Sequence, residues 1–103
     1  MILVYMTAKD KAEAMKIAKV LLDKKLIACA NIFDNVTSMY EWNGELCEEG
    51  EVVAILKSRH ELFEQIRDEI LLLHSYENPA IVSINADGVS DKFATWIDAQ
   101  TIN

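Results

Sequence analysis

The groups best suited to chemistry in this sequence gather around His74. This histidine ends an apolar periodic segment and is followed closely by Tyr76 and Glu77. An imidazole can bind a metal or carry a proton near neutral pH, and a neighbouring carboxylate can orient its ring. A histidine at a helix end can also do no more than hydrogen-bond a terminal carbonyl. His74 is therefore the leading candidate for a functional residue, with helix capping as the alternative.

Two cysteines are the other candidates for metal chemistry. Cys29 and Cys47 belong to no CxxC pair and are too few for a disulfide framework, so we expect reduced thiols. Cys29 lies in an apolar segment, where a thiol is either a buried core residue or a soft metal ligand. Asn31 shares its strand face and is expected to be buried, where it must find hydrogen-bond partners. Cys47 lies among glutamates, and we interpret it as incidental.

Four aromatic residues and two charged residues could together bind a small ligand. The set consists of Tyr40, Trp42, Tyr76, Trp96, Lys57 and Glu77. Apolar walls with a few convergent polar groups are typical of ligand pockets, and this set would suit a pocket at a subunit boundary. Tyrosine and tryptophan are equally typical of interfaces, so an aromatic seam between subunits is the alternative. Lys57 lies near the predicted core and is expected to pair with Glu77.

A long β-hairpin must position many of these residues. Asn43-Gly44 is a strong signal for a two-residue turn, because both residues tolerate positive φ. The turn pairs two strands within residues 26–57 and places Tyr40 opposite Cys47, with a bulge predicted at Asp34-Asn35. Neither face of this hairpin is uniformly apolar. We therefore expect its tip to extend beyond the core and to find aromatic partners on another subunit.

The segment before the hairpin predicts a strand and an amphipathic helix. Residues 2–7 form an apolar run that suits a buried central strand. Asp10 and Glu13 have the spacing of a capping box, which starts a helix. The stripe of that helix that should pack on the sheet holds Met15, Ala18, Leu21 and Leu22.

The segment after the hairpin predicts a helix, a strand and a final helix. Ser58 and Glu61 repeat the capping-box spacing before a periodic apolar segment that ends at His74. Pro79 cannot continue this helix, and residues 80–85 are then predicted to form a strand. Ser90 is placed to cap the last helix.

The order of elements predicts an α+β fold of the ferredoxin-like βαββαβ type with a C-terminal helix, as one domain over residues 1–103. Two strand–helix–strand units joined through the hairpin form an antiparallel sheet with both helices on one face. Only the C-terminal helix remains to cover the other face. We therefore expect this face to be hidden by association of chains.

Composition excludes several partners. The chain carries a net charge of −7, and no stretch is expected to gather lysine and arginine on one side, so nucleic acid is not an expected partner. No apolar run approaches the length of a membrane span, and the N-terminus lacks the basic start of a signal peptide. We expect no membrane partner and a cytoplasmic location.

Five spaced blocks resemble the CutA family of divalent-cation tolerance proteins. The blocks are Leu26-Ile27-Ala28-Cys29-Ala30-Asn31, Ser38-x-Tyr40-x-Trp42-x-Gly44, Ile55-x-Lys57, His74-x-Tyr76-Glu77-x-Pro79-Ala80-Ile81, and Trp96. They keep one register over essentially the whole chain. The resemblance implies a ferredoxin-like protomer in a tight homotrimer, whose long hairpins join sheets between subunits. It also implies a role in tolerance of copper and other divalent metals.

The resemblance further implies a set of metal ligands. Some family members are thought to bind copper through a cysteine late in the first strand and two adjacent histidines after the second helix. Met6 and Leu73 stand at two of these places, and His74 stands at the third. A soft thioether can bind copper(I), so the implied set is His74, Met6 and Cys29. The ion would be copper or another divalent cation, and no organic cofactor is expected.

Two other functions stay open beside metal binding. A regulatory trimer resembling the PII signal proteins in architecture could hold a small anionic metabolite between subunits near Lys57, Tyr76 and Glu77. A structural or adaptor trimer could bind another protein through its aromatic and hairpin surfaces. The sequence has no Ser-His-Asp order, no glycine-rich phosphate loop and no HExxH motif, so we do not expect an enzyme.

Overall fold

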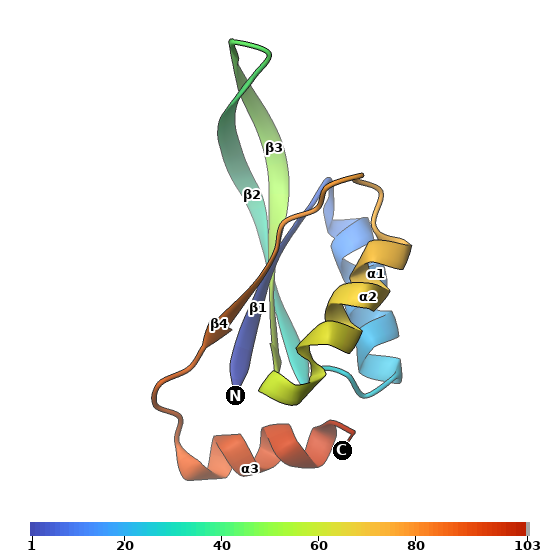
Figure 1. The fold of residues 1–103 in the computed structure, drawn as a ribbon, viewed down its shortest axis with the longest axis vertical. Coiled ribbons are helices and arrows are strands. Elements are labelled where there is room, and N and C mark those ends of the chain that lie inside the picture. The colour runs from blue at the N-terminus through green and yellow to red at the C-terminus, as the bar shows by residue number, and fades with distance from the viewer. Residues whose placement is uncertain (103) are drawn as a thin grey trace.

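The computed structural model describes residues 1–102 and has a four-stranded antiparallel sheet in the order β2-β3-β1-β4 (Figure 1). This confirms the predicted order of elements. The elements are β1 (Ile2–Ala8), α1 (Lys11–Asp23), β2 (Cys29–Trp42), β3 (Glu45–Ser58), the 3₁₀ turn η1 (His60–Leu62), α2 (Phe63–Leu73), β4 (Ile81–Asn85) and α3 (Asp91–Gln100). Within the described residues, no helix is long and apolar enough to cross a membrane.

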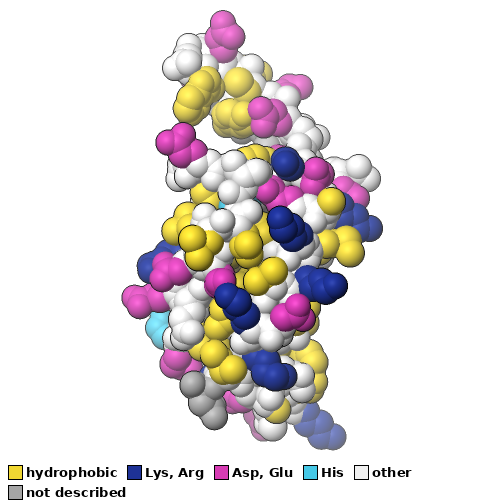
Figure 2. Space-filling view, turned by 90° about the vertical axis from the view of Figure 1, so that its right-hand side faces the viewer, with side chains coloured by type: hydrophobic (Ala, Val, Ile, Leu, Met, Phe, Trp, Pro, Cys, Tyr) yellow, Lys and Arg dark blue, Asp and Glu magenta, His cyan; other side chains and the backbone are white. Residues whose placement is uncertain are grey.

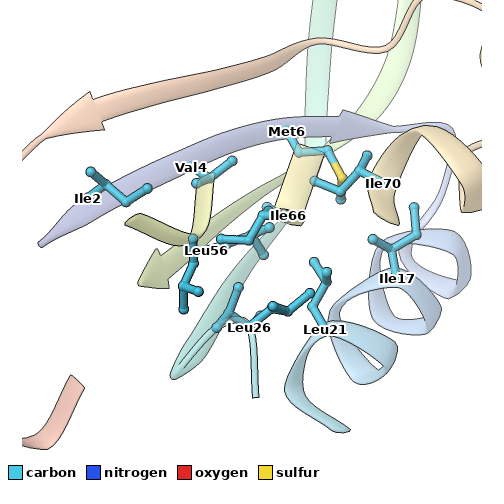
Figure 3. Close-up of a cluster of buried hydrophobic side chains, with 12 residues drawn as sticks. Ile2, Val4, Met6, Ile17, Leu21, Leu26, Leu56, Ile66 and Ile70 are labelled. Atoms are coloured by element: carbon cyan, nitrogen blue, oxygen red, sulfur yellow. The ribbon is translucent and has the colours of Figure 1, made fainter. Parts of the chain in front are cut away.

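The core lies between the sheet and the pair of helices α1 and α2, which cover the same face (Figure 1). Alternate residues of the central strand β1, beginning with Ile2 and Val4, point into this layer and are fully buried. Figure 3 shows that Met6, the third of these residues, lies beside Ile70 of α2, and that Ile17 and Leu21 of α1 belong to the same cluster. The expectation of a buried central strand is confirmed.

Helix α1 begins where it was predicted to begin, but only one of the two hydrogen bonds of the predicted capping box is formed. The Asp10 side chain accepts a hydrogen bond from the Glu13 backbone N–H at 2.8 Å, which confirms the cap. Glu13 accepts instead from the backbone N–H of Lys9 at 3.3 Å. The predicted core stripe was wrong at two positions, since Met15 is 52% exposed and Leu22 41% exposed. These two side chains lie on the outer side of the helix.

The predicted capping box before α2 was wrong. Ser58 is the last residue of β3, and its hydroxyl donates to the Leu26 carbonyl at 2.6 Å. The helix begins only at Phe63, after the 3₁₀ turn, without a side-chain cap. Ser90 does stand at the N-cap of α3, but its side chain makes no capping hydrogen bond.

The hairpin of β2 and β3 has the predicted register. Tyr40 pairs with Cys47, and the register shifts between Phe33 and Val36, where the bulge was expected. Asn43 and Gly44 both have positive φ, at 51° and 79°. The hairpin projects well beyond the helices, and the molecule measures 46 × 27 × 21 Å (Figure 1). Its tip therefore has no cover from the rest of the protomer.

Gly44→Ala is expected to lower the free energy of unfolding by about 1 kcal/mol, because a Cβ disfavours the left-handed backbone conformation. An added Cβ at Gly44 would touch nothing, so backbone strain is the main cost. Gly88→Ala is the matched control, since its site is equally open and its φ lies outside the left-handed region. Urea denaturation of both variants measures the effect. Equal shifts of the two midpoints would contradict the strain argument.

The sheet face opposite α1 and α2 is largely uncovered. Phe33, Val82 and Ile84 are each about half exposed on it. Helix α3 lies across the lower end of the sheet only, where the Lys57 ammonium stands 5.6 Å from the centre of the Phe93 ring (Figure 1). The expectation that one chain leaves this face open is confirmed.

Candidate functional site

His74 is buried where the loop between α2 and β4 passes the end of β1 (Figure 1). Its Nδ1 accepts a hydrogen bond from the Tyr76 backbone N–H at 3.0 Å. A backbone N–H can only donate, so the ring proton resides on Nε2, which donates to the Thr7 carbonyl at 2.7 Å. Both ring nitrogens are therefore engaged with the backbone, and neither offers a lone pair to a metal.

Glu13 holds the next residue of the loop. Its second carboxylate oxygen accepts a hydrogen bond from the Ser75 backbone N–H at 2.9 Å. Burial disfavours the charged form of Glu13, but the hydrogen bonds from Ser75 and Lys9 outweigh it, and the pKa of this carboxyl lies below its usual value. The carboxylate therefore ties the start of α1 to the loop.

Glu51 holds the loop from the hairpin side. One carboxylate oxygen accepts from the Tyr76 hydroxyl at 2.8 Å, and the other accepts from the Ser38 hydroxyl. Burial, followed by this hydrogen bond, raises the pKa of Tyr76 well above its ordinary value of 10. The ring of Tyr76 also lies 4.8 Å from that of His74. Three consecutive contacts thus fix the loop to β1, α1 and β3.

An open pocket of about 370 Å³ adjoins this network. Its lining residues are Thr7, Tyr40, Glu49, Glu51, Tyr76, Asn78 and Ala80. A hydrogen bond to Glu49 raises the pKa of Tyr40 to about 12. Two tyrosines of the predicted ligand set are therefore brought together, with carboxylates for neighbours.

Glu51→Gln is expected to lower the pKa of Tyr76 toward 10, because the amide still accepts the hydrogen bond but no longer repels a phenolate. The folded state now holds this proton more tightly than the unfolded chain, so stability is lost as the pH rises above 10. That alkaline loss should shrink in the variant. Tyrosinate absorbance in a Tyr5→Phe, Tyr40→Phe background measures the pKa. Glu48→Gln, the same charge change at an exposed position, should leave it unmoved; an equal fall would contradict the assignment.

The implied metal ligands are not brought together in the protomer. Met6 is fully buried in the core, on the face of the sheet that α1 and α2 cover. Cys29 pairs with Lys57, which itself pairs with Leu3, so it lies on the opposite face. Among residues 1–102, no group of three or more histidine, cysteine or acidic side chains could hold a metal ion.

The remaining members of the predicted ligand set are spread over the molecule. Trp42 is 67% exposed near the hairpin tip, and Trp96 is stacked on Phe93 in α3. Lys57 makes no ion pair with Glu77 within the described residues and instead contacts Phe93. Asn31, expected to be buried, is exposed on the open sheet face, because no element of the same protomer covers it there.

Sequence reasoning missed Glu13 and Glu51 as the residues that position the loop. Glu13 was assigned only to the helix cap, and Glu51 was not singled out as a site residue. The one local signal for Glu51 is that it directly precedes Val52, the first apolar residue of the buried half of β3.

Comparisons with known proteins agree with this fold. The family model described as "CutA1 divalent ion tolerance protein" matches residues 2–100. The divalent-cation tolerance protein CutA of Pyrococcus horikoshii is 42% identical over 101 residues, which are 98% of each chain. The crystal structure of CutA1 from Pyrococcus horikoshii superposes with a TM-score of 0.95 at 40% identity over 100% of both chains. That of CutA1 from Ehrlichia chaffeensis gives 0.96 at 38% identity over 99% and 95% of the two chains. The chain therefore belongs to the CutA1 divalent ion tolerance family.

Proposed function

We propose that this chain serves in tolerance of divalent cations as a cytoplasmic homotrimer, and that it acts by binding rather than by catalysing a reaction. The relatives that carry the name divalent-cation tolerance protein match it over nearly its full length, which supports the role. The observation that carries the trimer is the open apolar sheet face. A further support for binding is that both nitrogens of His74 are occupied by backbone groups, so neither is free to move a substrate proton.

The open face and the two sheet edges together favour a closed ring of copies. The open face exposes the apolar side chains of Phe33, Val82 and Ile84. Burial of this apolar surface against another copy would be favourable. Strands β2 and β4 each pair with one neighbour only, so each offers a free edge. An edge of one kind that meets an edge of the other kind is a head-to-tail contact, and such contacts close into a ring when the rotation between successive copies allows it.

Copper is the cation that the resemblance implies, but His74, Met6 and Cys29 do not fit a copper site within one protomer. His74 has no free lone pair, Met6 is buried in the core, and Cys29 lies across the sheet from Met6. No step of the proposed function passes through these three residues together. The small-metabolite alternative is no better supported, since Lys57 lies with α3 rather than with Tyr76.

Native mass spectrometry of protein purified without chelator or affinity tag tests the proposal, because it reports the number of subunits and any retained ions together. Three subunits are expected. A solitary folded protomer at micromolar concentration would overturn the trimer. Copper titration by calorimetry on the same preparation tests the cation, and retention of neither copper nor another divalent cation would count against direct binding.

His74→Gln completes the test of the metal site. The amide can donate and accept hydrogen bonds but is a poor copper ligand. We expect copper binding, where it is seen in the parent protein, to be unchanged in this variant. Loss of binding in a folded trimeric variant would return His74 to the metal site.

A further inference from the structure

A groove runs along α1 beside the edge strand β2. Its volume is about 400 Å³, which lies in the range of small-molecule sites. One wall extends along α1 from Ala12 to Leu22, and the other consists of Ala30 and Ile32 of β2. At a rise of 1.5 Å per residue the wall on α1 is about 15 Å long. The groove is therefore elongated and suits an extended ligand better than a compact one.

The wall on β2 joins the groove to the hydrophobic core. Ala30 pairs with Leu56, and Ile32 pairs with Ala54. Directly paired residues share a face of the sheet, so Ala30 and Ile32 lie on the buried face that the helices cover. Both are partly buried and pack against the core cluster. A ligand in the groove would therefore contact apolar surface that is continuous with the core.

The wall on α1 is apolar inside and basic at its rim. Ala18 is buried, whereas Met15 and Leu22 are 52% and 41% exposed, although both were expected in the core. Lys16 and Lys19 also line the groove, and both are exposed. Within residues 1–102 neither lysine makes an ion pair with a carboxylate. Two ammonium groups thus stand beside an apolar groove with their charges uncompensated by the described chain.

These lysines belong to a basic region in an otherwise acidic protein. Six of the ten lysine and arginine residues fall within residues 9–25, together with only three acidic residues. The expectation that no stretch gathers basic residues on one side was therefore wrong. Figure 2, which looks onto the side of the molecule where the helices lie, shows lysine and arginine side chains alternating with hydrophobic ones along this surface.

We propose that the groove between α1 and β2 binds a single-chain amphiphile with an anionic head group, of the fatty-acid class. The tail lies along Met15, Leu22 and Ile32, where burial of methylene groups supplies most of the affinity. The head group lies at Lys16 and Lys19, whose ammonium groups can donate charge-assisted hydrogen bonds to a carboxylate. The apolar walls select the tail, the lysines select the sign of the head group, and the elongated shape favours a chain over a ring system.

The charge distribution favours a small anion over a large anionic surface. Outside residues 9–25, acidic side chains outnumber lysine and arginine fourteen to four. A membrane or a nucleic acid would meet this acidic remainder and be repelled by it, whereas one carboxylate in the groove meets the two lysines. The inference goes beyond the proposed function and does not depend on it. A strand of another copy that pairs with β2 would continue the sheet and leave the helix-side groove open.

Titration of the native protein with dodecanoate, below the concentration at which it forms micelles, tests the proposal. We expect the amide signals in ¹H–¹⁵N spectra to shift within residues 12–22 and 30–32. Octanoate should bind at least about 10-fold more weakly, because it lacks four methylene groups that the longer chain can bury. Shifts confined to the open sheet face around Val82 and Ile84 would overturn the assignment of the groove, and so would equal affinity for the two chains.

The double variant Lys16→Gln, Lys19→Gln tests the role of the head group. We expect it to bind dodecanoate about 10-fold more weakly, since two charge-assisted contacts are lost. Arg67→Gln, Lys92→Gln is the matched control, because it removes the same charge from α2 and α3, and its affinity should change less than about 2-fold. An equal loss in both double variants would show non-specific attraction by net charge and would overturn the site.

Met15→Glu tests the tail region and should abolish dodecanoate binding, because it places a carboxylate in the apolar part of the groove. The variant should fold, since Met15 already reaches solvent, and circular dichroism checks this. Undiminished binding to the folded variant would overturn the proposed place of the tail.

Co-sedimentation with phosphatidylglycerol vesicles separates a free amphiphile from a membrane surface. We expect the protein to stay in the supernatant. Capture by the vesicles that Lys16→Gln, Lys19→Gln abolishes, without any binding of dodecanoate in solution, would identify a membrane surface as the partner and overturn the proposal. None of these readouts measures divalent-cation binding or the number of subunits, so failure here leaves the proposed function standing.

Discussion

His74→Ala is expected to lower the free energy of unfolding by about 3 kcal/mol. The substitution removes two hydrogen bonds and leaves the Thr7 carbonyl and the Tyr76 N–H without their partner. His74 is also buried, so the lost ring leaves a cavity beside Tyr76. Denaturant unfolding monitored by circular dichroism measures the loss. The loop from His74 to Pro79 should also gain faster amide exchange, because its first anchor is gone.

His60→Ala is the matched control for that result. His60 is exposed in the 3₁₀ turn that precedes α2, so its removal should change stability by less than about 0.5 kcal/mol. A similar loss of stability in both variants would contradict the view that the two hydrogen bonds of His74 stabilise the fold. His74→Gln should recover part of the loss, since an amide can donate to the Thr7 carbonyl or accept from Tyr76.

The hairpin could be predicted because its information is local. Asn43-Gly44 fixes the turn type, and the turn then fixes every cross-strand pair up to the bulge at Asp34-Asn35. The buried strand β1 could likewise be predicted from its apolar run. The N-cap of α1 was correct for the same reason, since Asp10 and Glu13 are neighbours along the chain.

Errors arose where tertiary contacts outweigh local spacing. Ser58 and Glu61 have the spacing of a capping box, but the Ser58 hydroxyl satisfies the Leu26 carbonyl, a partner 32 residues away. Met15 and Leu22 fit the periodicity of a core stripe, yet the edge position of β2 leaves their side of α1 open. Periodicity identifies an apolar surface of a helix, but it cannot distinguish a surface that packs within the chain from a surface that stays exposed on the protomer.

The candidate site shows the same contrast between local signals, which could be predicted, and tertiary contacts, which could not. His74 could be predicted as the centre of the site, but Glu13 and Glu51, the two carboxylates that complete the loop network, lie 62 and 25 residues along the chain from their partners. Lys57 was grouped with Tyr76 by residue type alone. The pairing of Lys57 with Leu3 places it near the start of β1, whereas His74 meets Thr7 at the other end, roughly 13 Å along the strand.

Ile84→Lys is expected to weaken association of the protomers by at least about 100-fold. Ile84 is 49% exposed at the edge strand β4, on the open face that the proposed homotrimer buries. An ammonium placed there must be desolvated without a partner, and symmetry repeats the cost in every subunit. The protomer itself should fold, because the substituted side chain already reaches solvent on that face. Sedimentation velocity over a dilution series measures the change.

Leu72→Lys is the matched control, since it makes the same apolar-to-cationic change on the helix side of the protomer. Leu72 is 81% exposed on α2, so an ammonium there stays in water whether or not the sheet face is covered. Association should therefore be unaltered. If both variants dissociated equally, the effect would come from net charge and not from the sheet face. If neither did, the apolar side chains of β4 would have to be solvent-exposed in the assembled protein, and another surface would have to hold the copies together.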